Sequence, residues 1–277
     1  MAEDSRDSLD DSAHAAVPLP PKRKGLYILP NAISLAALFA AFFAIVMAIN
    51  GRFEAAAIGI FASAVLDSLD GRVARMTHTQ SAFGEQMDSL CDMVSFGLAP
   101  ALIIYIWALQ GLGKFGWMAA FIYCAAAALR LARFNVNISV VDKRYFQGLP
   151  SPAAAALVMG LIWVMDDAGF KGVAKIDWLA WTAFGVTLYA GLSMVTNAPF
   201  YSFKVVGKRH TVPFAVIVAI ALGIAVINID PPIVLFALFC GYGVSGYAVY
   251  AYKKAKGKPV SVIATSTDEP DEAGLHD

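Results

Sequence analysis

Four aspartates between Asp67 and Asp92 have the spacing expected of a metal-dependent phosphate site. Asp67 and Asp70 are three residues apart, which places them on one face of a helix. Asp88 and Asp92 are four residues apart and also share a face. Carboxylate oxygens are the ligands that Mg²⁺ and Mn²⁺ prefer, and these ions leave coordination positions open for substrate phosphates. We therefore expect the four carboxylates, carried by two neighbouring helices, to converge on divalent metal ions.

Small residues accompany these acids at the same helical spacing. Gly71 and Ala74 lie four and seven residues after Asp67, and Gly84 lies four residues before Asp88. Such residues leave room for a ligand to approach the backbone. Two ions about 3.5–4 Å apart would form a clamp for in-line displacement at phosphorus. No Ser, Cys or His stands out as a covalent nucleophile with a base beside it, so a direct displacement is favoured over a covalent intermediate.

The acids belong to a very apolar chain. Of its 277 residues 58% are hydrophobic, and the mean hydropathy of +0.62 is outside the range of an ordinary soluble domain. A charged side chain at the bilayer centre costs about 2.5–3.5 kcal/mol, so a cluster of acids there needs cations to offset it. The formal net charge is zero, which gives no electrostatic argument for binding nucleic acid. The three cysteines lack the paired spacing of a disulfide framework or a zinc site.

Apolar runs of about 20 residues predict transmembrane helices. We expect an all-α integral membrane protein with a polar cavity that faces the cytoplasm. Its spans, about eight, are predicted at 31–49, 53–75, 86–108, 115–134, 151–168, 178–196, 212–229 and 232–252. The membrane-embedded domain is expected over 22–258. Residues 1–21 and 259–277 are polar and are expected to be disordered tails.

Lysine and arginine are distributed unevenly between the two sides of the predicted bundle. With the N-terminus inside, sixteen of them fall in inner segments, and four fall in outer loops: Arg52, Lys114, Lys171 and Lys175. The positive-inside rule then places both termini and the acidic site on the cytoplasmic side of the membrane. The basic segment 20–30 is expected either to lie in the interface as a short amphipathic element or only to set the topology.

The acids and small residues together resemble the signature of the CDP-alcohol phosphotransferases, integral membrane enzymes of phospholipid synthesis. The family pattern D-x2-D-G-x2-A-R-x8-G-x3-D-x3-D is matched at Asp67, Asp70, Gly71, Ala74, Arg75, Gly84, Asp88 and Asp92. The resemblance implies that the four aspartates bind two ions of Mg²⁺ or Mn²⁺ and that Asp92 is also the general base. For the CDP group it implies contacts from Asp70, Gly71, Ala74, Arg75 and Gly84. It further implies a homodimer.

Segments 95–101, 129–136 and 145–155 are similar to the serine-using bacterial members of this family. This resemblance implies transfer of the phosphatidyl group from CDP-diacylglycerol to L-serine, with release of CMP. The carboxylate of serine needs a fixed cation, and Arg130 and Arg133 lie on one helical face, where they could provide it. The same arginines could instead reach lipid headgroups. Asn31 and Ser34, at the start of the first span, are expected either to line the cavity, with Asn31 in the serine site, or to cap the span.

Two other functions stay open at this point. Glycerol 3-phosphate as the acceptor would give phosphatidylglycerophosphate within the same family, and the cations Arg130, Arg133 and Lys204 do not exclude it. A cation transporter would also place acids in a membrane. Transport favours acids near the middle of the bilayer and repeated halves, whereas these acids lie toward one face and no repeat is visible. The turn 148–152 needs no function, because its prolines suit the start of a helix.

Overall fold

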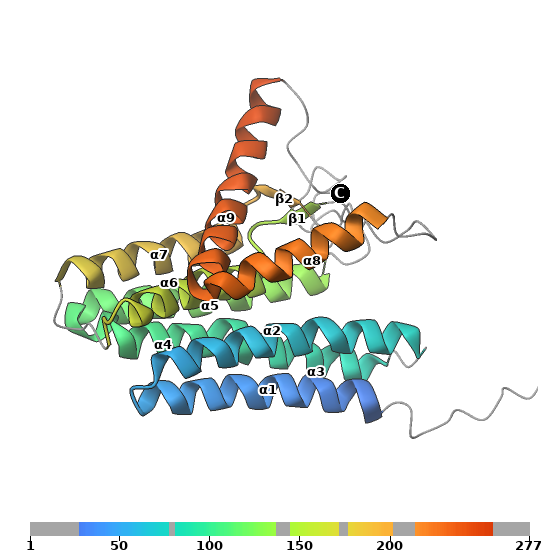
Figure 1. Cartoon of the computed structure of the whole chain (residues 1–277), viewed down its shortest axis with the longest axis horizontal. Coiled ribbons are helices and arrows are strands. Elements are labelled where there is room, and N and C mark those ends of the chain that lie inside the picture. Colours follow the sequence, from blue (N-terminus) through green and yellow to red (C-terminus); the bar gives the residue numbers. More distant parts are fainter. Residues whose placement is uncertain (1–27, 78–80, 137–144, 172–176, 202–213, 257–277) are drawn as a thin grey trace, which may run out of the picture.

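The computed structural model describes residues 28–77, 81–136, 145–171, 177–201 and 214–256, and this part of the chain is mostly helical. Most of its helices run side by side, and α9 stands out from them at a steep angle (Figure 1). The elements in chain order are α1 (Ile28–Ile49), α2 (Phe53–Met76), α3 (Ala82–Asp92), a π-helical segment (Met93–Leu98), α4 (Ala99–Trp107), a 3₁₀ turn (Leu109–Leu112), α5 (Lys114–Val136), β1 (Tyr145–Gln147), α6 (Ser151–Asp167), α7 (Asp177–Val195), β2 (Pro199–Tyr201), α8 (Phe214–Ile229) and α9 (Pro231–Ala255).

Helices occupy all eight stretches predicted as spans, but not all of them are equally suited to cross a membrane. Within the described residues, five helical segments are long and apolar enough by length and composition, at Leu29–Ile49, Ala82–Trp107, Lys114–Val136, Asp177–Val195 and Pro231–Ala255. Helix α2 differs because it carries one glutamate, two aspartates and two arginines. Helices α6 and α8 have only 17 and 16 residues. The five apolar segments indicate that the chain is an integral membrane protein. The count of eight spans stays a prediction, because α2, α6 and α8 are not among these five segments.

The expectation of an all-helical fold is wrong in one detail, which is a short β-ribbon between α5 and α8. Strands β1 and β2 pair antiparallel, with Tyr145 opposite Tyr201 and Gln147 opposite Pro199. Strands of three residues are too short to show a period of two in the sequence, so no pattern predicted them. The predicted tails 1–21 and 259–277, and most of the basic segment 20–30, lie outside the described residues.

Helices α1 and α2 pack closely because small residues line their contact. Ala37, Ala41 and Ala44 recur every three or four residues along α1 and are buried. A Cβ atom on Gly59 of α2 would lie 3.0 Å from the Cβ of Ala44. The hydroxyl of Ser63 in α2 donates to the backbone carbonyl of Ala37 at 2.8 Å. Small residues and hydroxyl groups at helix contacts are typical of membrane bundles, and here they fix α2, which carries the first two acids, against α1.

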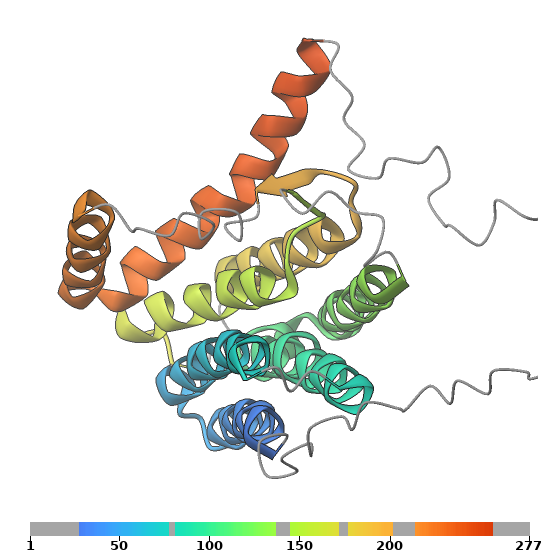
Figure 2. The same cartoon turned by 90° about the vertical axis from the view of Figure 1, so that its right-hand side faces the viewer.

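The outer face of α1 has the opposite character. Leu35, Phe39 and Phe42 are exposed there, and Phe39 is 70% exposed. Large apolar side chains outside and small ones inside are expected where lipid, not water, surrounds the helix. Seen end-on in Figure 2, α1, α2 and α3 lie next to one another on the same side of the bundle. This arrangement brings the helices that carry the acids and Asn31 together.

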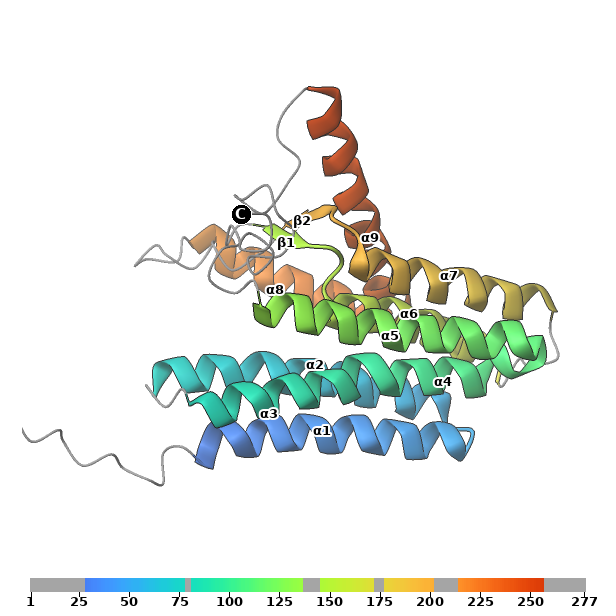
Figure 3. The same cartoon turned by 180° about the vertical axis from the view of Figure 1, so that it is seen from behind.

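The third predicted span contains a π-helical segment directly after Asp92. Over Met93–Leu98 the helix widens, and α4 then continues the span. Figure 3 shows α5 running alongside α4, and a buried side chain of α5 reaches the widened turn, where the Tyr123 hydroxyl donates to the Phe96 carbonyl at 2.9 Å. Single π-turns inside α-helices are frequent at functional sites. The hydroxyl of Tyr123 thus supplies a hydrogen bond to the irregular turn that follows the last acid.

We predict that Tyr123→Phe destabilises the protein by about 1–3 kcal/mol, because the Phe96 carbonyl would lose its partner in the core. Thermal unfolding in detergent measures this as a lower midpoint. The control is Tyr250→Phe, which removes a hydroxyl from an exposed tyrosine near the end of α9. A Tyr123→Phe variant that unfolds at the same temperature as the control would show that the π-turn does not need this hydrogen bond.

Candidate active site

The structure brings three of the predicted carboxylates together. Asp67 and Asp70 come from the C-terminal half of α2, and Asp88 comes from α3. One oxygen from each lies within 4.8 Å of the others, a separation from which three carboxylates could hold a metal ion. Helical periodicity places Asp67 and Asp70 on one face of α2. The packing of α2 and α3 against α1 brings this face to the face of α3 that carries Asp88. This group of Asp67, Asp70 and Asp88 is called the acidic triad below.

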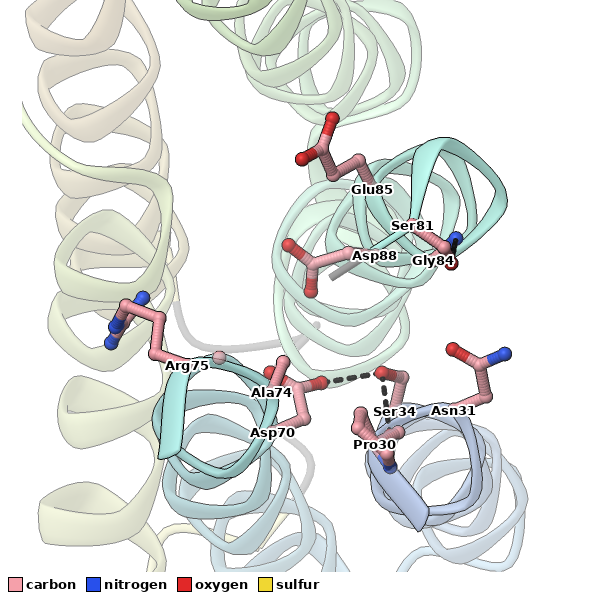
Figure 4. A pocket seen from close by; sticks show the side chains of 11 residues that line it. Pro30, Asn31, Ser34, Asp70, Ala74, Arg75, Ser81, Gly84, Glu85 and Asp88 are labelled. Carbon is pink, nitrogen blue, oxygen red and sulfur yellow. Dashed lines mark hydrogen bonds between the residues drawn. The ribbon is translucent and has the colours of Figure 1, made fainter. Parts of the chain in front are cut away.

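A pocket of about 170 Å³ opens beside the acidic triad. Figure 4 shows that α1, α2 and α3 surround it, with Asp70 and Asp88 on opposite walls. Its lining contains all five residues predicted for CDP binding: Asp70, Gly71, Ala74, Arg75 and Gly84. Asn31, Ser34 and Asp88, which the sequence also singled out, line it as well, together with Pro30, Ser81 and Glu85, which it did not. The predicted residues therefore share one small cavity.

Asp70 is the most deeply placed acid of the pocket, with only 5% of its surface exposed. The hydroxyl oxygen of Ser34 lies 2.6 Å from Asp70 Oδ2 and 3.2 Å from the carbonyl oxygen of Pro30, within donating range of both (Figure 4). A carboxylate buried to this extent is not a surface acid at the end of a span. The contact from α1 holds the Asp70 carboxylate on the side that faces the pocket.

Small residues shape the pocket as the sequence suggested. A Cβ atom on Gly84 would lie 3.2 Å from both Asn31 Oδ1 and Ser81 Oγ, so the wall has little room for a side chain there. Ser81 starts α3 by accepting a hydrogen bond from the Gly84 N–H at 3.1 Å. The helix therefore begins before the predicted start at residue 86. The Arg75 side chain is exposed and points away from Asp88 in Figure 4.

Asn31 lies inside α1, not at its start, because the helix begins at Ile28. The expected alternative of an N-terminal cap is therefore wrong. Its side chain faces Gly84 across the pocket, which groups it with the predicted CDP residues and not with Arg130 or Arg133. Ser34 lies nearly one helical turn further along α1 on the same wall. Together with Pro30, the two residues form the α1 side of the pocket.

Asp92 lies behind the acidic triad, at the end of α3, and does not line the pocket. Its side chain lies close to that of Asp67 and attracts the guanidinium of Arg130. The Oδ1 atom of Asp92 is buried, and no hydrogen-bond partner for it is found among the described residues. A buried carboxylate oxygen without a partner is costly, so it suggests a group that binds there in the working enzyme.

Arg130 and Arg133 lie on α5 and have different partners. Arg130 Nη1 donates to the Ser151 hydroxyl at 2.8 Å, whereas Arg133 Nη1 donates to the backbone carbonyl of Val195 at 3.5 Å, at the end of α7. The Nε atom of Arg130 is buried and has no hydrogen-bond partner in the part of the chain that the structure describes. Because Arg130 and Asp92 attract one another, Arg130 is the arginine that faces the acids. Lys204 lies outside the described residues.

The sequence reasoning missed several of these neighbours. Glu85 and Ser81 line the pocket, and Ser151 binds Arg130. A serine immediately before an apolar helical run is a signal for an N-terminal cap, and it could have identified Ser81. No comparable signal exists for Glu85 or Ser151, because their roles depend on which helices are neighbours.

The chain is similar to several known proteins. A family model described as CDP-alcohol phosphatidyltransferase matches residues 27–192. A Helicobacter pylori protein named CDP-diacylglycerol--serine O-phosphatidyltransferase is 34% identical over 221 residues, 79% of this chain and 90% of that protein. Proteins of the same name from Mycobacterium bovis and Methanocaldococcus jannaschii are 30% and 32% identical, covering 80% and 68% of this chain and 79% and 82% of their own length. A solved structure of Mycobacterium tuberculosis phosphatidylinositol phosphate synthase with CDP-DAG bound covers 61% of this chain and 87% of that one, with 17% identity and a TM-score of 0.47.

Proposed function

The chain belongs to the CDP-alcohol phosphatidyltransferase family, and from that premise we propose that it transfers the phosphatidyl group of CDP-diacylglycerol to the hydroxyl of L-serine. The products are phosphatidylserine and CMP. The single observation that carries the proposal is the acidic triad beside a pocket lined by the family's small residues, in a chain whose relatives are named for this reaction. The serine hydroxyl forms a bond to the phosphorus that carries diacylglycerol, and the bond from that phosphorus to the bridging oxygen breaks.

Divalent metal ions are general in this family, and the acidic triad fits them. Three carboxylates with oxygens within 4.8 Å of one another offer the hard oxygen ligands that Mg²⁺ or Mn²⁺ takes. We assign Asp67, Asp70 and Asp88 to a pair of such ions, with Asp92 as a further ligand. When bound, the ions would supply positive charge that offsets the negative charge of the pyrophosphate and of the leaving CMP.

Asp92 is our candidate for the general base. Its buried Oδ1 lacks a partner in the described structure, so it is available to accept the proton of the serine hydroxyl. Arg130 opposes the negative charge of Asp92 and keeps the carboxylate ready to accept that proton. The Asp67 carboxylate lies beside that of Asp92.

The CDP group occupies the pocket of the acidic triad. Gly71, Ala74 and Gly84 leave space for the nucleotide beside Asp70, and we now place Asn31 on this side of the site. Arg75 is proposed to contact phosphate by swinging its exposed side chain toward the pocket. The acyl chains lie in the bilayer next to α1, α2 and α3.

The serine carboxylate is assigned to Arg130. Its Nε is buried and without a described partner, and a guanidinium edge suits a carboxylate. Arg133 is expected to support the same region from one turn further along α5, where it binds the end of α7. We further infer a cytoplasmic site and cytoplasmic termini from the distribution of Lys and Arg, and a homodimer from the family resemblance.

The test is release of CMP from CDP-diacylglycerol by the purified protein in detergent with Mg²⁺ or Mn²⁺. L-serine, glycerol 3-phosphate and inositol phosphate are supplied one at a time. We expect release that requires both a divalent ion and L-serine. Release with glycerol 3-phosphate alone would keep the family chemistry and overturn the assigned acceptor. Absence of release with every alcohol would overturn the proposal.

The two arginines are predicted to respond differently to substitution. Arg130→Ala should raise KM for serine by about 10- to 100-fold, which corresponds to the loss of a charged hydrogen bond, while KM for CDP-diacylglycerol stays nearly unchanged. Arg133→Ala should affect thermal stability more than KM for serine, because Arg133 Nη1 donates to the backbone carbonyl of Val195 at the end of α7. Steady-state kinetics and thermal unfolding of both variants measure this. Equal KM values for serine in Arg130→Ala and wild type would remove Arg130 from the serine site.

A further inference from the structure

Ser151 is a buried serine whose hydroxyl faces the candidate active site. It is the first residue of α6 and has no exposed surface. The hydroxyl accepts a hydrogen bond from Arg130 Nη1 at 2.8 Å, across 21 residues of sequence. This contact connects the start of α6 to the arginine that we assign to serine.

The backbone around Ser151 is fixed by the turn that precedes it. Gly148 has φ of 74°, and a Cβ atom there would collide with the backbone carbonyl oxygen of Met194. The N–H groups of Gly148 and Leu149 donate to the carbonyls of Ala198 and Ser193 at 3.0 and 2.9 Å. The turn is therefore held against the end of α7 on one side, and Ser151 follows it at a fixed place. A left-handed conformation of this kind favours glycine.

The hydroxyl of Ser151 does not serve as a helix cap. The N-terminal capping position of α6 is Pro150, which makes no side-chain hydrogen bond, and the next residues begin the helix. The partner of the hydroxyl is the guanidinium of Arg130. A role in starting α6 therefore leaves this hydrogen bond unexplained.

The hydrogen bond restricts how Arg130 presents its remaining nitrogen atoms. One Nη is held by Ser151, and the buried Nε has no partner among the described residues. Asp92 attracts the same guanidinium and has its own buried oxygen without a described partner. Arginine is flexible, and holding one edge of its planar fork reduces the cost of offering the other edge to a ligand.

We infer that Ser151 is a positioning residue for the acceptor alcohol: it orients Arg130 so that the free guanidinium edge meets the carboxylate of serine. This inference rests on the proposed function, because it needs Arg130 to bind the acceptor. It gives the segment Gly148–Ser151 a role beyond starting a helix. The residue acts through Arg130 and does not touch the reacting atoms.

The experiment is a double-mutant cycle on the full-length protein in detergent. Ser151→Ala, Arg130→Lys and the double variant are compared for KM of serine, KM of CDP-diacylglycerol and kcat. We expect Ser151→Ala to raise KM for serine about tenfold, as expected for a lost hydrogen bond to a charged group, with KM for CDP-diacylglycerol unchanged. In the Arg130→Lys background, Ser151→Ala should change KM for serine little further, because lysine has no planar guanidinium for Ser151 to orient.

Ser193→Ala is the matched control. Ser193 is also a buried serine near the same end of the bundle, but its hydroxyl is hydrogen-bonded to Tyr247 at 2.7 Å and not to Arg130. The control is expected to lose stability without a change in KM for serine. A Ser151→Ala variant that behaves like this control would overturn the inference, as would an equal rise of KM in both Arg130 backgrounds.

The outcomes separate this inference from the proposed function. If Arg130→Lys and Arg130→Ala both leave KM for serine unchanged, the assignment of Arg130 fails, and the positioning role fails with it. If the arginine variants raise KM and Ser151→Ala does not, only the positioning role fails. Serine-dependent CMP release by the wild type tests the function independently of either residue.

Discussion

Asp92→Asn is expected to lower kcat by about 10²–10⁴-fold, which is the usual contribution of a general base. Asparagine has the size and shape of aspartate, but its neutral amide group is not basic enough to accept the proton of the serine hydroxyl. Because Asp92 lies behind the pocket and not in its wall, KM for CDP-diacylglycerol should change little. The measurement is the initial rate of CMP release at saturating serine and metal.

The control for this variant is Asp167→Asn. Asp167 is an exposed carboxylate at the far end of α6, about 24 Å from Ser151 at a helical rise of ~1.5 Å per residue. It should keep wild-type turnover. If Asp92→Asn recovers its rate when the metal concentration is raised, Asp92 acts as a ligand and not as the base. If Asp92→Asn keeps full turnover under all conditions, neither role is correct.

The acidic triad shows what the sequence could predict about the site. The spacing of Asp67 and Asp70 fixes their common face as soon as the segment is helical, whatever surrounds it. The same applies to Asp88 and Asp92. The sequence did not predict how α3 is placed against α2, and that placement decides that Asp88 joins the triad while Asp92 lies behind it. Contacts between helices depend on the side chains of both partners, which no single segment contains.

Arg130 and Arg133 also show that a single segment of sequence does not predict contacts between helices. A spacing of three residues placed Arg130 and Arg133 on one face and made them equivalent. In the structure they bind different helices, because α6 begins beside Arg130 and α7 ends beside Arg133. The hydrogen bond from Ser34 to Asp70 is likewise a contact between residues 36 positions apart. Such contacts depend on the packing of small residues along α1 and α2, and hydrophobic periodicity does not encode their register.

The π-turn and the β-ribbon were also beyond the sequence, for local reasons. An apolar run over 86–108 predicts a helix but gives no sign that the helix widens after Asp92. The bond from Tyr123 that supports the widened turn comes from α5, 27 residues away. The β-ribbon is made of two strands of three residues that meet across about 50 residues. Long, strongly apolar helices were predicted well because their signal repeats over many residues.

Asp70→Asn is expected to lower kcat on the order of 10³-fold, because losing a charged metal ligand removes several kcal/mol of charge stabilisation from the transition state. The substitution should also raise the metal concentration needed for half-maximal activity. Asparagine can still accept the hydrogen bond from Ser34, so the packing of α1 against α2 should survive. A metal titration of CMP release, with thermal unfolding of the same samples, measures both effects.

Ser34→Ala provides a graded comparison with Asp70→Asn, because it removes the support of the carboxylate but leaves its charge. We expect a smaller loss of activity, about tenfold, from one hydrogen bond to a charged group. If the metal site is centred on the acidic triad, the loss of activity should be largest in Asp70→Asn, smaller in Ser34→Ala and absent in the exposed control Asp167→Asn. An unchanged metal requirement in Asp70→Asn would place the metal elsewhere. In that case the burial of Asp70 against Ser34 would be explained by helix packing alone.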